Sequence, residues 1–247
     1  MGASGKGLKR FTEFWWRDRG FSALLLLLIL VFFLSPFLDT WLAKIFLSIF
    51  LVLLLISGTA YTTTRRFPRL VSLVVATVAL IFGVLRYFIE SRLILGCSYI
   101  STAVFFFLLI SVLLKQVFRD GPVTGHRIWG AIAAYLLIGV TWTFMYELIA
   151  LFIPGAFSFP PSMTAPPGEP EHQSSLTYFS YVTMATLGYG DIVPVHPAAR
   201  MLAILEALTG LLFPAALLAR LVSLEIIYRN ERTDQDIRDE TGKGEDP

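Results

Sequence analysis

Six stretches of this chain are apolar over about the length that a helix needs to cross a membrane. A spanning helix takes roughly 20 consecutive, mostly apolar residues. The composition agrees, because 55% of the 247 residues are hydrophobic and only 15% are charged, well below the usage of soluble domains. The sequence therefore predicts an all-α membrane protein with six transmembrane helices. The stretches are 21–38, 41–58, 70–88, 93–118, 128–153 and 198–227.

The basic residues gather at alternate ends of these stretches. Sixteen of the 20 lysines and arginines lie in four places: the N-terminal segment 1–20, the loops after the second and fourth stretches, and the C-terminal end. Cytoplasmic segments of membrane proteins carry such an excess. We therefore expect a multi-pass protein with both termini in the cytoplasm. The short loops and the lack of glycosylation sequons favour a prokaryotic plasma (inner) membrane.

The connection between the fifth and sixth stretches contains an apolar segment that is too short to span. Residues 154–175 are proline-rich and polar, and they predict an extracellular loop. Residues 176–186 are apolar and aromatic, and they predict a re-entrant helix with Ser174 or Ser175 as its N-cap. Non-helical backbone at membrane depth is tolerated only inside protein or along a water-filled cavity. The segment that follows is therefore predicted to line a pore.

That segment is TLGYGD, residues 186–191, with glycines at alternate positions. Gly188 and Gly190 can adopt positive φ, which a residue with a Cβ resists. Alternating backbone handedness lets successive carbonyls point the same way and present a row of oxygens to a monovalent cation. One strand cannot surround an ion, so several copies must meet on an axis.

TLGYGD closely resembles the signature of the potassium-channel family, with Leu187 where valine is commonest. The resemblance implies a homotetramer in the lipid bilayer, with K⁺ as the permeant ion and no cofactor. The implied filter is 186–190, with K⁺ bound at Thr186, Leu187, Gly188 and Tyr189. It also implies that Asp191 caps the filter, with Tyr178 and Phe179 in an aromatic cuff around it.

The resemblance extends over a pore domain, 127–228, built from outer helix 128–153, loop 154–175, pore helix 176–186 and inner helix 198–227. Gly210 falls at the usual hinge position of the inner helix. Gly210 and Pro214 loosen this helix, either for a gating bend or as a fixed kink. Glu206 is an intramembrane acid that either tunes the filter from behind the pore helix or merely locks the sixth helix.

The four-helix region 21–118 lacks a voltage sensor. Its fourth stretch has no basic residue inside, whereas voltage gating needs several charges that cross the field. The region is then a structural collar or a sensor of something else. The tail, 229–247, is too short to form a domain, so a regulatory ligand or subunit would act elsewhere.

The functional hypothesis is a potassium-selective channel that is not steeply voltage-gated. No nucleophile–base pairing, zinc cluster or phosphate loop indicates an enzyme, and we expect no nucleic-acid partner. The alternatives are a non-selective cation channel, in which Tyr189 would tend to be replaced, and a non-conducting membrane sensor or transporter subunit. We expect Glu147 to be structural, and His172 and His196 to be solvated loop residues.

Overall fold

The computed structural model describes residues 66–86, 88–118 and 125–242. The predicted segments 1–20, 21–38 and 41–58 lie outside these residues, and so does the end of the tail, 243–247. The predicted orientation of the two termini rests largely on those segments and stays a prediction.

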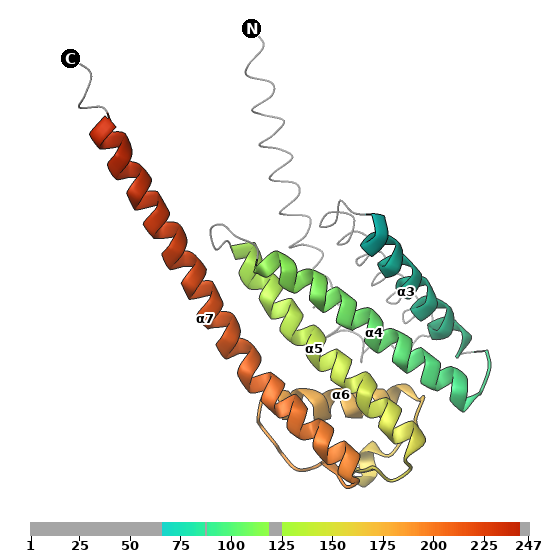
Figure 1. The fold of residues 1–247 in the computed structure, drawn as a ribbon. Coiled ribbons are helices and arrows are strands. Elements are labelled where there is room, and N and C mark those ends of the chain that lie inside the picture. The colour runs from blue at the N-terminus through green and yellow to red at the C-terminus, as the bar shows by residue number, and fades with distance from the viewer. Residues whose placement is uncertain (1–65, 87, 119–124, 243–247) are drawn as a thin grey trace.

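Helices dominate the described residues (Figure 1). A short 3-10 turn, η2, occupies Pro161–Met163. The strands β1 (Phe157–Ser158) and β2 (Val193–Pro194) pair antiparallel, with Phe157 opposite Pro194. The α-helices are α3 (Arg66–Leu85), α4 (Arg92–Val117), α5 (Gly125–Phe152), α6 (Pro170–Met184) and α7 (Pro197–Gly242).

Helix α4 packs against α3 on one side and against α5 on the other (Figure 1). Leu109 and Leu113 of α4 are each 1% exposed and belong to the same apolar cluster as Ala133, Ala134 and Leu137 of α5. The alanines allow the two backbones to come close, which is how helices associate where lipid offers no hydrophobic driving force.

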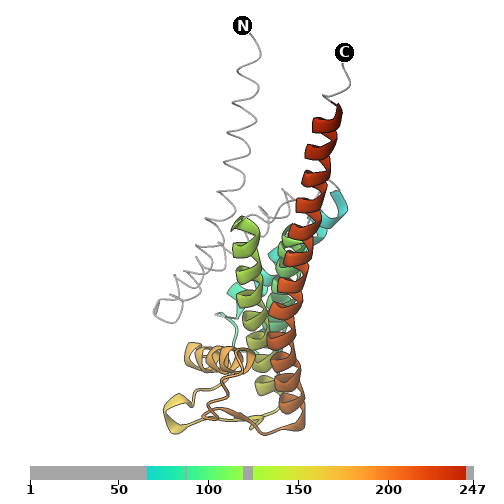
Figure 2. The same ribbon diagram turned by 90° about the vertical axis from the view of Figure 1, so that its left-hand side faces the viewer.

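The short helix α6 lies across α5 and α7 rather than along them (Figure 2). It contacts both helices, and α7 also contacts α5. The β1–β2 pair ties the segment after α5 to the segment before α7. Residues 185–192 connect the end of α6 to β2, which contacts α7.

Three described helices are long and apolar enough to cross a membrane: Arg92–Lys115, Arg127–Phe152 and Pro197–Ile227. They agree with the predicted stretches 93–118, 128–153 and 198–227 within a few residues. The predicted span at 70–88 overlaps α3, whose described apolar part is Leu73–Leu85, and it stays a prediction.

Helix α6 begins earlier than the predicted 176–186. It starts at Pro170, with Glu169 as N-cap, inside the predicted loop 154–175. Proline suits the first helical position, because its fixed φ matches the helix and its missing N–H has no partner there. The predicted caps were wrong: the Ser175 hydroxyl donates to the Glu171 carbonyl within the helix. The helix ends at Met184, two residues before the predicted end.

Helix α7 continues past residue 227, where the inner helix was predicted to end, to Gly242. It extends beyond the ends of α4 and α5 (Figure 1). Most of the predicted tail 229–247 is therefore helix. The chain after the apolar stretch has no helix-breaking residue until Gly242, so the backbone hydrogen bonding continues.

Leu109→Ala tests the packing of α4 on α5. We expect a loss of about 1–3 kcal/mol, below the range for soluble cores because lipid replaces water as the alternative environment. The measurement is thermal unfolding of the purified protein in detergent, followed by circular dichroism. Val104→Ala, at a position 45% exposed on the same helix, is the control. Equal destabilisation by the two variants would contradict this core.

Candidate functional site

The predicted filter segment has an alternating backbone. Thr186, Gly188 and Gly190 have positive φ values of 58°, 56° and 77°. The positive φ values predicted at the two glycines are confirmed, and the one at Thr186 was not foreseen, because L-residues rarely adopt it. The amide of Leu187 donates to the Val182 carbonyl at 2.9 Å. The segment is thus turned back onto the C-terminal end of α6.

One edge of this segment is held by Tyr178 of α6. Its hydroxyl donates to Oδ2 of Asp191 at 2.7 Å, and the amide of Ile192 donates to Oδ1 at 3.0 Å. The Tyr178 ring stacks on the ring of Tyr189, with centroids 6.5 Å apart and planes 14° from parallel. The Tyr178 hydrogen bond lowers the pKa of the Asp191 carboxyl below its ordinary value. Asp191 is therefore an ionised acceptor at neutral pH.

Phe179, the second residue of the predicted aromatic cuff, contacts α5 and β1 within the chain. Its ring packs edge-on against Tyr146 of α5 and Phe157 of β1, at 5.1 and 5.6 Å between centroids. It is 6% exposed. Consecutive helical residues point about 100° apart, so Tyr178 and Phe179 meet different partners within the chain. Phe179 attaches α6 to α5, while Tyr178 contacts Asp191 and Tyr189, and the cuff around the filter stays a prediction.

Glu206 of α7 lies behind α6 and is fully buried. Its carboxylate accepts hydrogen bonds from the Tyr146 hydroxyl of α5 and the Ser180 hydroxyl of α6. The Ser180 oxygen also lies 2.8 Å from the Gly139 carbonyl of α5. Three helices therefore meet at one carboxylate. Either role predicted for Glu206, support of the filter or locking of α7, is compatible with these contacts.

Gly210 is a point of close contact between α7 and α6. A Cβ built at this position would lie 2.1 Å from the Met184 carbonyl oxygen, at the last residue of α6. Pro214 follows four residues later and cannot donate a hydrogen bond to the Gly210 carbonyl. Helix α7 nevertheless runs unbroken through both residues. Position 210 therefore needs a residue without a side chain, because α6 lies so close. This holds whether or not α7 bends at Gly210.

The site is open on one side in the single chain. Leu187 is 56% exposed and Tyr189 is 66% exposed. In the apolar stretch of α7, only 11% is buried. A backbone segment with this much uncovered surface needs further protein around it at membrane depth.

Two histidines expected in solvated loops have structural partners instead. His172, in the first turn of α6, is 3% exposed and lies 3.0 Å from Glu147 of α5. His196 accepts the amide of Ala198 through Nδ1 and so caps the start of α7. Sequence analysis missed Tyr146, Ser180 and the Glu147–His172 pair. The signal was the presence of two acids, Glu147 and Glu206, inside apolar helices, because each requires a donor nearby.

Comparison with known proteins gives two similarities. Residues 129–225 match a protein family described as "Ion channel". This family is one of channels, not of enzymes. A protein of Oryza sativa subsp. japonica, "Two pore potassium channel c", is 38% identical to this chain over 90 residues.

Both similarities are partial in length. The rice alignment covers 36% of this chain and only 17% of the rice protein. The family match covers α6, the filter segment and β2, and most of α5 and of the apolar stretch of α7. It begins after α4 ends. The similarity to ion channels therefore belongs to the helices that position the site.

Gly210→Ala tests the contact with Met184. The added methyl must displace α6 or α7, and overpacking of this kind costs about 1–3 kcal/mol. We expect a lower thermal midpoint in detergent. The control is Gly83→Ala on α3, where an added Cβ meets nothing within 4 Å and helix propensity favours alanine. A Gly210→Ala protein as stable as Gly83→Ala would show that α7 does not lie this close to α6.

Proposed function

We propose that this protein is a potassium-selective channel that conducts K⁺ passively and is not steeply voltage-gated. The observation that carries the proposal is the alternation of positive φ at Thr186, Gly188 and Gly190. These residues directly follow the short helix α6. Carbonyl oxygens of 186–189 replace the water around a K⁺ ion in this proposal. The similarity of residues 129–225 to ion channels supports it.

The pore requires a homotetramer in the bilayer. One segment offers carbonyls on one side of an ion only, and the exposed Leu187 and Tyr189 need surrounding protein. The uncovered apolar face of α7 supplies surface for neighbouring copies and for lipid. The negative C-terminal end of α6 leads directly into the filter and favours a cation there.

Supporting residues hold this filter in the conducting shape. Tyr178 and Asp191 brace its outer end, and Glu206 fixes α6 from behind through Ser180. Opening occurs at the turn of α7 between Gly210 and Pro214. Because Gly210 touches the end of α6, a bend in α7 also shifts the base of the filter.

Strong voltage dependence is not expected from the described helices. Arg92 and Lys115 lie close to the two ends of α4, and its interior carries no basic residue. A charge must move through the membrane field to sense voltage, at about 2.3 kcal/mol per charge per 100 mV. We propose that the helices before α5 act as a collar.

A planar bilayer with K⁺ on one side and Na⁺ on the other tests the proposal. We expect the reversal potential of the full-length protein to approach the potassium limit, with open probability varying gently with voltage. Equal passage of Na⁺ would point to a non-selective cation channel. Absence of current would favour the non-conducting sensor or transporter subunit.

Gly190→Ala links the current to the filter backbone. Gly190 has φ +77° and open space around an added Cβ within the chain, so the substitution strains only the backbone. We expect loss of K⁺ selectivity or of current. Gly155→Ala is a matched control, with φ +78° and equal space in the loop after α5. Unchanged K⁺ current in Gly190→Ala would contradict the assignment of the filter.

Tyr178→Phe removes the donor to Asp191 and keeps the ring on Tyr189. We expect current that decays severalfold faster, because the outer end of the filter loses its brace. The lowered pKa of Asp191 means that this bond is fully present above the ordinary carboxyl pKa of about 4 and is lost only below it. The wild-type and variant proteins should therefore differ throughout the neutral range. Identical decay at pH 7 would contradict a supporting role.

A further inference from the structure

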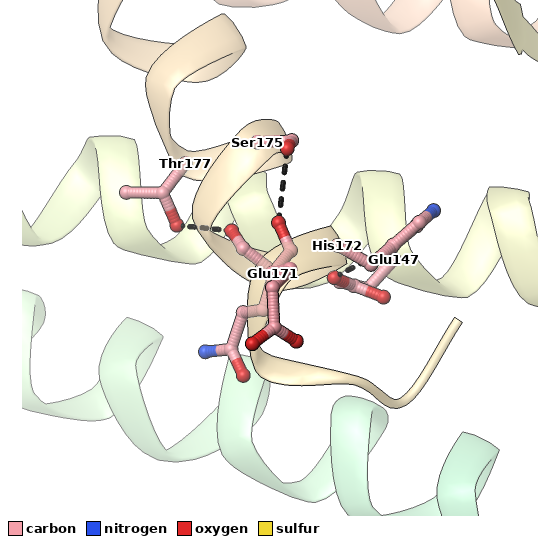
Figure 3. A network of polar contacts seen from close by, with 6 residues as sticks. Glu147, Glu171, His172, Ser175 and Thr177 are labelled. Carbon is pink, nitrogen blue, oxygen red and sulfur yellow. Dashed lines mark hydrogen bonds and ion pairs between the residues drawn. The ribbon is translucent and has the colours of Figure 1, made fainter. Parts of the chain in front are cut away.

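A second buried carboxylate, Glu147, holds the other end of α6. It is fully buried near the end of α5, and its Oε1 lies 3.0 Å from Nδ1 of His172 (Figure 3). Among the described residues its second oxygen, Oε2, has no hydrogen-bond partner. A buried carboxylate is costly unless donors surround it, so this group depends on the side chains packed around it.

The surroundings of the pair come from four segments. Tyr99 of α4 is 1% exposed, and its hydroxyl faces the Glu147 carboxylate as a side-chain hydrogen-bond donor, outside normal hydrogen-bond geometry to Oε2. The ring of Phe159, after β1, lies 5.3 Å from the His172 ring. The positive charge of Arg86, in the turn after α3, interacts electrostatically with Tyr99. Glu171, beside His172 on α6, is exposed and turned to solvent.

The charge of the pair depends on one proton. With a neutral imidazole and an ionised carboxylate, the buried pair carries a net charge of −1. One added proton, whether on the ring or on Oε2, brings the net charge to zero. In a buried site a net charge costs far more than an ion pair or a neutral pair. Histidine is the side chain that exchanges a proton near neutral pH.

We propose that Glu147 and His172, with Tyr99, form a proton-binding site through which the pH at the outer side regulates the channel. This inference rests on the proposed function for its effect on current. The site fastens the first turn of α6 to α5. Eight residues, or about 12 Å, further along the same helix, Ser180 binds Glu206. Loss of the proton weakens the first attachment and loosens the helix that supports the filter.

The direction of the effect follows from the charge. On the acid side the pair is neutral overall and holds α6 to α5. On the alkaline side an uncompensated carboxylate remains buried, and the contact is less stable. Asp191 does not produce such a change, because its pKa is lowered from an already acidic value. We therefore expect larger K⁺ currents at an outer pH of about 6 than at about 8.

The first experiment records K⁺ current from the full-length protein in a planar bilayer. The pH is varied between about 5.5 and 8.5 on one side at a time. We expect a severalfold change in wild type from the outer side, and a flat response in His172→Gln, which keeps the ring's approximate size and a donor. His196→Gln, which changes a half-buried histidine at the start of α7, should respond like wild type. A wild-type response retained in His172→Gln would overturn the proposal.

A second readout does not depend on current. Hydrogen exchange of peptides covering 154–184, corrected for intrinsic rates, is compared across the same pH range in wild type, His172→Gln and Glu147→Gln. We expect faster exchange at the start of α6 as the pH rises in wild type only. If exchange at the start of α6 rises with pH in a protein that carries no K⁺ current, the proton site stands and the proposed function fails. If exchange at the start of α6 does not change with pH in wild type, the proposal of a proton site is wrong, whatever the K⁺ current.

Discussion

The bond between a buried carboxylate and a short helix determines how the rest of the site is arranged. Glu206 of α7 accepts hydrogen bonds from Ser180 of α6 and Tyr146 of α5. Separating any of these helices would leave a carboxylate or a hydroxyl unpaired in an apolar environment, which costs several kcal/mol. Helix α6 is too short to span a membrane, so its length does not fix its depth in the bilayer. Its position comes from this contact.

Close packing at two glycines also positions α6. An added Cβ on Gly139 of α5 would lie 2.7 Å from the Tyr181 ring, and one on Gly210 would lie 2.1 Å from the Met184 carbonyl. The Tyr181 hydroxyl donates to the Leu136 carbonyl at 2.6 Å. The two glycines thus make room for the last two turns of α6 between α5 and α7. The segment TLGYGD begins where this contact ends.

Prediction from sequence succeeded where a local property decides the outcome. The apolar stretches at 93–118 and 128–153 became α4 and α5 with small shifts, because about 20 apolar residues in lipid must satisfy their backbone as a helix. It failed at the start of α6, because the residues after Pro170 are polar and were assigned to the loop. It also did not foresee the contacts of Phe179 with Tyr146 and Phe157, because neighbouring aromatic residues look equivalent until the helix directs them to different partners.

The amino-acid sequence by itself determined the helices and the glycine alternation of the filter segment, since both follow from the preferences of adjacent residues for backbone angles and for lipid. Only the tertiary structure decided which groups meet. Tyr146 and Glu206 are 60 residues apart, and Glu147 and His172 are 25 apart. No local preference specifies such a pair. The packing of α5, α6 and α7 brings each acid to its donor, because a carboxylate buried among apolar side chains is stable only where one is present.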